Sequence, residues 1–137
     1  MKELTRSKII KKLDLVFSTY IRLRDCDSHG YIVCPLCWAK IPFKKAQNMH
    51  FITRACWMYR YDEMNCHAWC MRCNVMLHGN YIIYTRWMQR KYWIPKVDEM
   101  IGNKLKVFKI TTPQLKWMLD FYKKKCDKLI EEKHLSL

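Results

Sequence analysis

Cysteines are the residues most able to do chemistry in this chain of 137 residues, which contains eight of them. Four lie in two Cys-x-x-Cys motifs, Cys34-Pro35-Leu36-Cys37 and Cys70-Met71-Arg72-Cys73. Each motif places two thiolates on one tight turn, so two motifs together can occupy the four corners of a tetrahedron around zinc. Because such a site has no open position, its metal is structural and supports folding. We therefore predict one structural zinc per chain, bound by Cys34, Cys37, Cys70 and Cys73.

The remaining cysteines lack this spacing, and we expect them to be core thiols: Cys26, Cys56, Cys66 and Cys126. The N-terminal residues contain no apolar signal-peptide core, and no apolar run is long enough to span a bilayer. The sequence therefore predicts a protein of the cytoplasm or nucleoplasm of its host, where thiols stay reduced and are available for metal binding.

Polar residues between and just after the cysteine pairs form a second group that could do chemistry. His50 lies on a short apolar stretch, Asn65 precedes the second pair, and Asn74 directly follows Cys73. If the segment after Cys73 is helical, Asn74 and His78 share one face and could bind one divalent cation through an amide oxygen and an imidazole nitrogen. Taken alone, His50 could equally be a buried strand histidine, and Asn74 could be a helix cap.

The charge of the chain indicates the class of partner. The formal net charge is +14, from 26 Lys plus Arg against 12 Asp plus Glu. A polyanion relieves the self-repulsion of such a chain by releasing counterions. No segment combines a basic face with the free apolar face of an interfacial helix, which argues against a membrane partner. The sequence therefore predicts a protein that binds nucleic acid.

Several unusual motifs, taken in order, resemble the phage NinG/Rap family of recombination nucleases. The motifs are Tyr20-Ile21-Arg22-Leu23-Arg24-Asp25, the first cysteine pair, His50-Phe51-Ile52-x-Arg54, Arg60-Tyr61-Asp62-Glu63-Met64-Asn65-x-His67-Ala68 and Cys70-x-Arg72-Cys73-Asn74-x-x-x-His78-Gly79-Asn80. The set running from His50 through Asn65 and Asn74 to His78 looks like the HNH, or ββα-metal, nuclease motif. Its arrangement is similar to that of phage endonuclease VII, a resolvase of branched DNA.

The resemblance implies a phage endodeoxyribonuclease that cleaves Holliday junctions and D-loops with Mg²⁺ or Mn²⁺. It implies that His50 is the general base, that Asn65 braces the loop, and that Asn74 and His78 hold the catalytic metal. The residues implied to meet DNA phosphates are Arg54, Arg60 and Arg72. Because cutting both strands of a junction needs two sites, a homodimer is expected. The alternative is a zinc-finger protein that binds nucleic acid without cutting it.

This chain departs from the family pattern at three positions. Met49 stands where many HNH nucleases carry an acidic metal ligand, Trp38 where a glycine is usual, and Trp69 where glutamine is common. A bulky residue after Cys37 could strain the turn or offer a surface for base stacking. Asp62 and Glu63 could pair with Arg54 or Arg60, or could supply the missing carboxylate.

The fold predicted from these patterns is α+β and mainly helical, with a zinc-stabilised ββα-metal core flanked by N- and C-terminal helices. We expect a single domain over residues 1–137, divided into an N-terminal helix (1–30), a zinc and HNH-like core (31–80) and a C-terminal helical region (81–137). Apolar spacing predicts a first helix over 6–23, and a helical pattern over 74–93 interrupted near 78–80. In the last helix, Thr112 is the expected N-cap and Pro113 the first helical residue.

Overall fold

The computed structural model describes residues 2–76 and 81–137 as a mixture of helices and small sheets. The α-helices are α1 (Arg6–Asp25), α2 (Trp57–Arg60), α3 (Tyr81–Tyr92), α4 (Ile94–Gly102) and α5 (Thr112–Lys133). Two short turns of other pitch are the 3₁₀-helix η1 (Phe43–Lys45) and the π-helix η2 (Arg72–Met76). The prediction of a mixed, mainly helical chain with helices at both ends is therefore confirmed. The predicted interruption near 78–80 lies outside the described residues.

Two antiparallel strand pairs lie within residues 31–80, the segment predicted to be the zinc and HNH-like core. Strand β1 (Tyr31–Val33) pairs with β2 (Lys40–Pro42), and the loop between them carries the first cysteine pair. Strand β3 (Gln47–His50) pairs with β4 (Cys66–Trp69), in a register that sets His50 opposite Cys66. The loop that joins β3 to β4 includes α2, and the second cysteine pair begins directly after β4.

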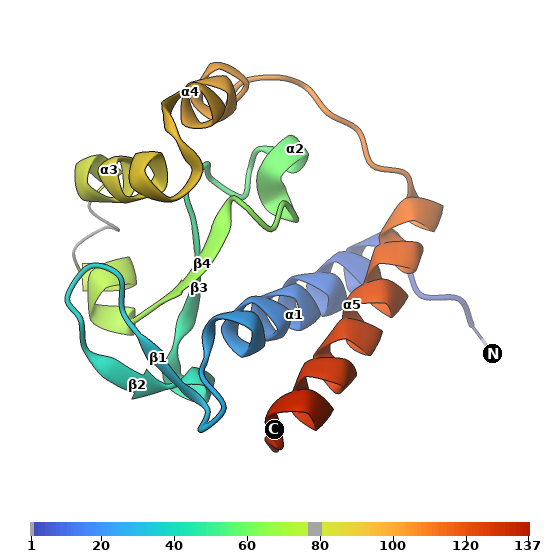
Figure 1. The fold of residues 1–137 in the computed structure, drawn as a ribbon. Coiled ribbons are helices and arrows are strands. Elements are labelled where there is room, and N and C mark those ends of the chain that lie inside the picture. Colours follow the sequence, from blue (N-terminus) through green and yellow to red (C-terminus); the bar gives the residue numbers. More distant parts are fainter. Residues whose placement is uncertain (1, 77–80) are drawn as a thin grey trace.

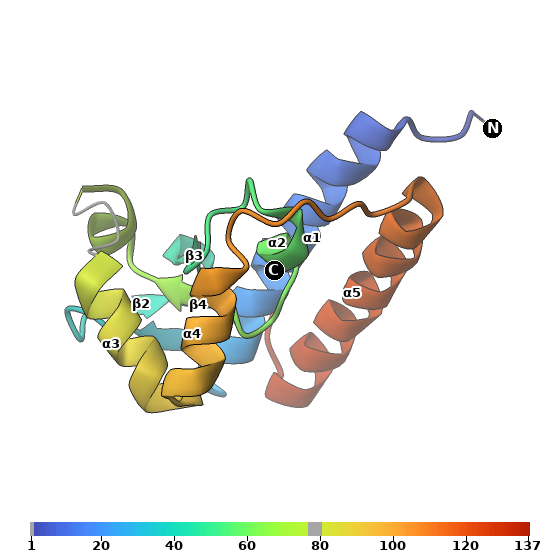
Figure 2. The same ribbon diagram turned by 90° about the horizontal axis from the view of Figure 1, so that it is seen from above.

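The terminal helices form one half of the interior. Thr5 caps the N-terminus of α1, where its hydroxyl accepts a hydrogen bond from the Lys8 amide. In both views α1 lies between the β3–β4 pair and α5 (Figures 1 and 2). The apolar stripe of α1 is buried against α5 and the strands, through residues that include Ile9, Leu13, Phe17, Tyr20 and Ile21. This long helix pair supplies a rigid support for one face of β3 and β4.

A second core cluster lies around the cysteine pairs, α3 and α4. Tyr84 and Met88 of α3 and Val97 and Met100 of α4 are fully buried there. Trp69, at the end of β4, packs against Tyr84 with ring centroids 4.5 Å apart. The bulky residue at the position where the family commonly has glutamine is therefore a core residue.

The start of α5 corrects the predicted cap by one residue. The N-cap is Thr111 rather than Thr112, and Thr112 and Pro113 open the helix. The Thr111 hydroxyl accepts a hydrogen bond from the Gln114 amide at 3.3 Å, and the Gln114 side chain accepts one from the Thr111 amide at 2.8 Å. This reciprocal pair satisfies two backbone donors at once, which a cap at Thr112 would not do.

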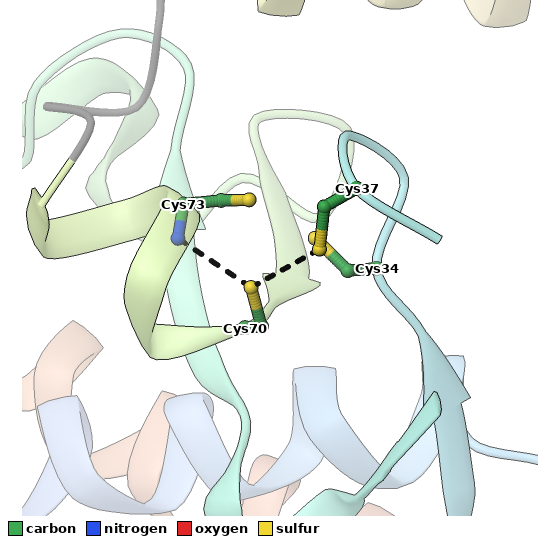
Figure 3. A group of neighbouring side chains, drawn as sticks. All are labelled: Cys34, Cys37, Cys70 and Cys73. Atoms are coloured by element: carbon green, nitrogen blue, oxygen red, sulfur yellow. Dashed lines mark hydrogen bonds between the residues drawn. The ribbon is translucent and has the colours of Figure 1, made fainter. Parts of the chain in front are cut away.

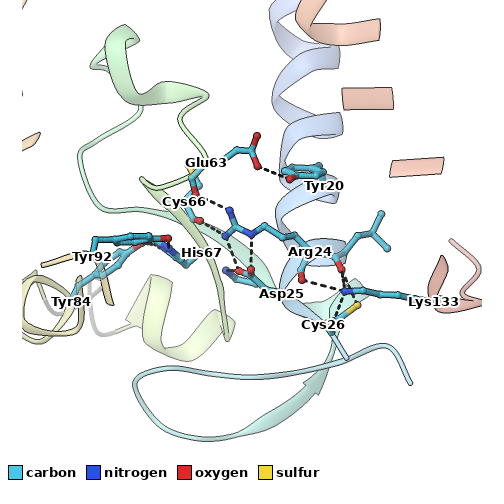
Figure 4. A network of polar contacts seen from close by, with 12 residues as sticks. Tyr20, Arg24, Asp25, Cys26, Glu63, Cys66, His67, Tyr84, Tyr92 and Lys133 are labelled. Carbon is cyan, nitrogen blue, oxygen red and sulfur yellow. Dashed lines mark hydrogen bonds and ion pairs between the residues drawn. The ribbon is translucent and has the colours of Figure 1, made fainter. Parts of the chain in front are cut away.

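Adjacent charged residues at the end of α1 attach this helix to the outer edge of β4 (Figure 4). Arg24 donates to the Cys66 carbonyl at 2.7 Å, and the Asp25 carboxylate accepts from the Ala68 amide at 2.8 Å. Lys133 of α5 donates to backbone carbonyls at the C-terminus of α1, including that of Cys26 at 2.6 Å. These contacts satisfy backbone groups that would otherwise leave the strand edge and the helix end unpaired. The Arg24-Asp25 motif is therefore structural.

Among the described residues, no helix is both long enough and apolar enough to cross a bilayer.

Candidate functional site

The two cysteine pairs meet in one cluster. The sulfur atoms of Cys34, Cys37, Cys70 and Cys73 all lie within 4.8 Å of one another, and those of Cys37 and Cys70 are 3.5 Å apart. Figure 3 shows the four thiols converging from the β1–β2 loop and from the turn after β4. Sulfurs bound to one tetrahedral zinc are separated by about 3.8 Å, because each Zn–S bond is about 2.3 Å long. The cluster is therefore consistent with the predicted structural zinc.

The other cysteines lie elsewhere, and Cys26, Cys56, Cys66 and Cys126 are all buried. Within the described part of the chain, none of them joins a group of potential metal ligands. Burial raises the pKa of Cys126 to about 11, as expected for a core thiol.

Trp38 closes the first cysteine turn in a conformation that favours glycine. Its φ is 65°, its amide donates to the Cys34 carbonyl at 2.9 Å, and its side chain is 78% exposed. An L-residue in this left-handed region costs about 1–2 kcal/mol because its Cβ crowds the following carbonyl.

Replacing Trp38 by glycine is therefore expected to raise the free energy of unfolding by about 1 kcal/mol, since the Cβ is removed and little packing is lost. Urea unfolding of the zinc-loaded protein measures the change. Trp38→Ala is the matched control, because it removes the indole but keeps the Cβ. An equal gain in both variants would show that the indole rather than the backbone is the cause.

Two adjoining pockets, of about 430 and 480 Å³, flank the end of β3. Both are lined by Asn48, His50, Arg54 and Asn74, and we call them together the His50 groove. One pocket extends toward α1 and the other toward the start of α3. The fold thus brings His50 and Asn74, which are far apart in the sequence, to the same concave surface.

The His50 groove is basic. Its charged lining residues in the described part of the chain are Arg22, Arg54, Arg60 and Lys104, with one carboxylate, Asp14. Asp14 accepts hydrogen bonds from Arg60 at 2.6 and 3.0 Å and from the Tyr61 hydroxyl at 2.7 Å. Because Asp14 neutralises Arg60, the groove presents the charges of Arg22, Arg54 and Lys104 to a ligand. Such a surface suits a phosphate backbone.

His50 lies in this groove, and one of its ring nitrogens is hydrogen-bonded to the backbone. Its Nε2 lies 3.0 Å from the Arg60 carbonyl, and a carbonyl only accepts, so Nε2 carries the proton. In the neutral ring Nδ1 then has a free lone pair. Burial lowers the pKa of His50 below 6.5, and the positive charges of Arg60 and Arg54 lower it further, whereas the Arg60 carbonyl opposes this shift. His50 is therefore neutral at pH 7 and chemically able to act as a base.

Asn74 faces β3 from η2. Its side-chain NH₂ donates to Oε1 of Gln47 at 2.6 Å, and its own amide N–H bonds the Cys70 carbonyl at 3.1 Å. The turn that holds the second cysteine pair therefore also sets the position of Asn74. Gln47 and Asn48 belong to the groove although the sequence did not single them out. Asn48 lies two residues before His50 on β3, and the two-residue period of a strand is a signal that could have found it.

Asn65 is fully buried and joins the two arms of the β3–β4 loop. Its side-chain oxygen accepts from the Ile52 amide at 2.7 Å, and its NH₂ donates to the carbonyls of Ile52 at 2.9 Å and Tyr59 at 3.0 Å. The loop residues between these anchors include Arg54, and the Arg60 carbonyl that binds His50 follows directly. Asn65 therefore controls the surroundings of His50 without facing the groove.

Asn65→Ala is expected to lower the free energy of unfolding by roughly 3 kcal/mol or more, because three buried backbone groups lose their partner at about 1–3 kcal/mol each. Asn103→Ala is the matched control, since half-buried Asn103 donates one hydrogen bond, to the Tyr59 hydroxyl at 3.0 Å. The control should lose about 1 kcal/mol. Equal denaturant midpoints for the two variants would contradict the bracing role.

The three arginines predicted to meet phosphates are placed differently. Arg54 is exposed and lines both pockets, and Arg72 is exposed on η2. Arg60 is held by Asp14, as described, and its guanidinium lies 4.5 Å from the centre of the Trp57 ring. In the groove it is therefore a supporting residue rather than a free cation.

The acidic residues Asp62 and Glu63 do not pair with these arginines, so that prediction is wrong. Glu63 accepts hydrogen bonds from the hydroxyls of Tyr20 and Tyr122, at 2.5 and 3.2 Å. Asp62 accepts one from the Met64 amide at 2.9 Å. The tertiary contact between α1 and α2 supplies Asp14 as the partner of Arg60 instead, and the sequence could not indicate it.

The family motif contains two further histidines, His67 and His78. His67 is buried, and its ring nitrogens lie 2.9 Å from the Tyr84 hydroxyl and 2.7 Å from the Tyr92 hydroxyl (Figure 4). Burial lowers the pKa of His67 to about 2, so it stays neutral and structural. The predicted metal ligand His78 lies outside the described residues.

Comparison with known proteins identifies one family. The model of a family described as Bacteriophage Lambda NinG protein matches residues 2–132. No curated protein and no solved structure matches the chain. Because the family match spans nearly the whole chain, this protein belongs to the family of the bacteriophage lambda NinG protein.

Proposed function

We propose that this chain is a metal-dependent endonuclease that hydrolyses phosphodiester bonds in branched DNA such as Holliday junctions and D-loops. The observation that carries the proposal is His50, a neutral histidine in the wall of a basic groove, whose Nδ1 has no hydrogen-bond partner among the described residues. A general base must hold a lone pair at the working pH and lie where the substrate binds. Membership of the NinG family agrees with a role in phage DNA metabolism.

In the proposed reaction, Nδ1 of His50 removes a proton from a water molecule that attacks the phosphorus. The bond from phosphorus to the 3′-oxygen breaks, and the electron pair leaves with that oxygen. The Arg60 carbonyl, 3.0 Å from Nε2, orients the ring and stabilises the imidazolium that forms. Arg54 and Lys104, which line the same pocket as His50, bind the phosphate charge.

The order of elements around His50 supports an HNH-type, or ββα-metal, site. The antiparallel strands β3 and β4 carry the histidine and lead into η2, which carries Asn74. The zinc cluster joins the end of β4 and η2 to the β1–β2 loop. In this proposal the zinc takes no part in the chemistry and fixes the distance between His50 and Asn74.

A divalent cation is part of the proposal, and the groove has donors of the type that Mg²⁺ and Mn²⁺ prefer. Asn74 offers an amide oxygen, and Oδ1 of Asn48 is buried without a hydrogen-bond partner in the described residues. A buried acceptor of this kind has a lone pair available for a water molecule or an ion. Asn74 and Asn48 would hold the metal, with His78 as the further ligand that the family resemblance implies. The metal would stabilise negative charge that develops on the phosphate and on the leaving oxygen.

Binding to DNA is expected to be independent of sequence and to weaken with salt, because Lys and Arg contacts to phosphates displace counterions.

We further propose a homodimer, since two sites are needed to cut both strands of a junction. Analytical ultracentrifugation with and without a four-way junction tests this stoichiometry.

The proposed activity is tested with the zinc-loaded protein and three labelled substrates, a four-way junction, a D-loop and a linear duplex of matched sequence. We expect cutting of the branched substrates that needs Mg²⁺ or Mn²⁺, with less cutting of the duplex. Tight binding without cutting in either metal would instead establish the alternative, a zinc-finger protein that only binds nucleic acid.

A further inference from the structure

In the structure, the hydrogen bond between Asn74 and Gln47 leaves the oxygen end of the Asn74 amide available to a ligand. Asn74 Nδ2 lies 2.6 Å from Oε1 of Gln47, and this oxygen can only accept. The NH₂ end of Asn74 is therefore held against β3. Its oxygen, Oδ1, receives no hydrogen bond from the described residues, and Asn74 lines both pockets of the His50 groove.

This orientation matters because only the oxygen of an amide can bind a hard cation. If the side-chain amide of Asn74 could rotate by 180°, its NH₂ group would face the cation part of the time, and NH₂ repels a metal ion. Side chains that orient a metal ligand typically change metal affinity by 10–100-fold when they are removed. Gln47 occupies such a position, since it contacts Asn74 directly and lines the same groove.

We infer that Gln47 is a positioning residue that turns the oxygen of Asn74 toward the divalent cation of the His50 groove. This inference rests on the proposed function, because it assumes that Asn74 is a metal ligand. Gln47 acts through Asn74 and touches neither the water nor the phosphate. The role is specific to an acceptor at position 47, so a carboxylate there preserves it and an apolar side chain of similar length abolishes it.

The groove also indicates when the cation binds. Its one carboxylate within the described residues, Asp14, is occupied by Arg60 and Tyr61, so the ligands available there are neutral amides. Mg²⁺ is commonly held by one or two carboxylates together with substrate phosphates. A site of neutral amides beside Arg54 and Lys104 binds a cation weakly until a phosphate adds negative charge. The cation and the DNA therefore each increase the affinity for the other.

The test is a Mn²⁺ titration, observed by NMR, of the ¹⁵N-labelled, zinc-loaded protein bound to a short phosphorothioate DNA duplex, which supplies the phosphates and resists cleavage. The paramagnetic ion broadens amide signals near its site. In the wild type, broadening should centre on Asn74, Asn48 and His50. In Gln47→Met, the Mn²⁺ concentration at half-broadening should rise by about 10–100-fold. Gln47→Glu should bind at least as tightly as the wild type, because it keeps an acceptor and adds a charge.

The matched control is Gln89→Met, which changes a half-buried glutamine of α3 that lines neither pocket. The control should titrate as the wild type does, and ¹⁵N spectra without Mn²⁺ should confirm that each variant is folded. Unchanged half-broadening in Gln47→Met would overturn the role of Gln47 while leaving the proposed nuclease intact. Absence of broadening in the wild type, together with absence of cleavage, would overturn the proposed function itself.

Discussion

His50→Ala is expected to lower the rate of cleavage of a four-way junction by about 10²–10⁴-fold, the usual contribution of a general base. Binding of the junction should change little, because the phosphate contacts assigned to Arg54 and Lys104 remain. Single-turnover cleavage and gel-shift binding on the same samples measure the two effects separately. Wild-type cleavage rates in the variant would contradict the role of His50, and so would a loss of activity that follows a loss of binding.

The same histidine determines the expected pH dependence. Only the neutral form of His50 has a lone pair, and burial holds its pKa below 6.5. The base is therefore fully competent above this pKa, and cleavage should fall as pH decreases through a midpoint below 6.5. A free histidine would give a midpoint near its ordinary value of about 6.5. Gel-shift binding at each pH, with the metal held constant, serves as the control.

Cys73→Ser is expected to have the largest effect on folding. Structural zinc contributes about 10–16 kcal/mol of apparent binding free energy, which is comparable with the whole stability of a domain, about 5–15 kcal/mol. Loss of the metal should unfold the region around β4 and η2, and cleavage should disappear with it. Zinc content per chain and near-ultraviolet circular dichroism measure the outcome, and chelation of the wild-type zinc should reproduce it.

Cys126→Ala provides the matched control, because Cys126 is also buried but belongs to the packing of α1 against α5. This variant should keep one zinc per chain and lose only about 1–2 kcal/mol of stability from the missing sulfur. A Cys73→Ser protein that retains its zinc and its thermal midpoint would show that the cluster does not hold a structural metal.

Local sequence patterns predict the cysteine cluster and the terminal helices. The spacing of the cysteine pairs predicted which four thiols converge, because two residues between ligands set both sulfurs of a pair on one turn. The apolar period predicts the extent of the first helix, since 3.6-residue spacing is read within one element. The sequence predicts the cap of α5 one residue too late, because Thr111 and Thr112 both suit that role and the side chain of Gln114 decides between them.

Sequence patterns alone predict the two terminal helices, the cysteine cluster and the motif that contains His50, Asn65 and Asn74. The surroundings of these residues follow from the packing of the whole fold. The pairing of Arg60 with Asp14 and the contact between Gln47 and Asn74 join residues far apart in the chain. No local periodicity predicts such contacts, because the first depends on how α1 packs against α2 and the second on how η2 packs against β3. The protonated nitrogen of His50 is decided in the same way, by a carbonyl on the loop that Asn65 braces.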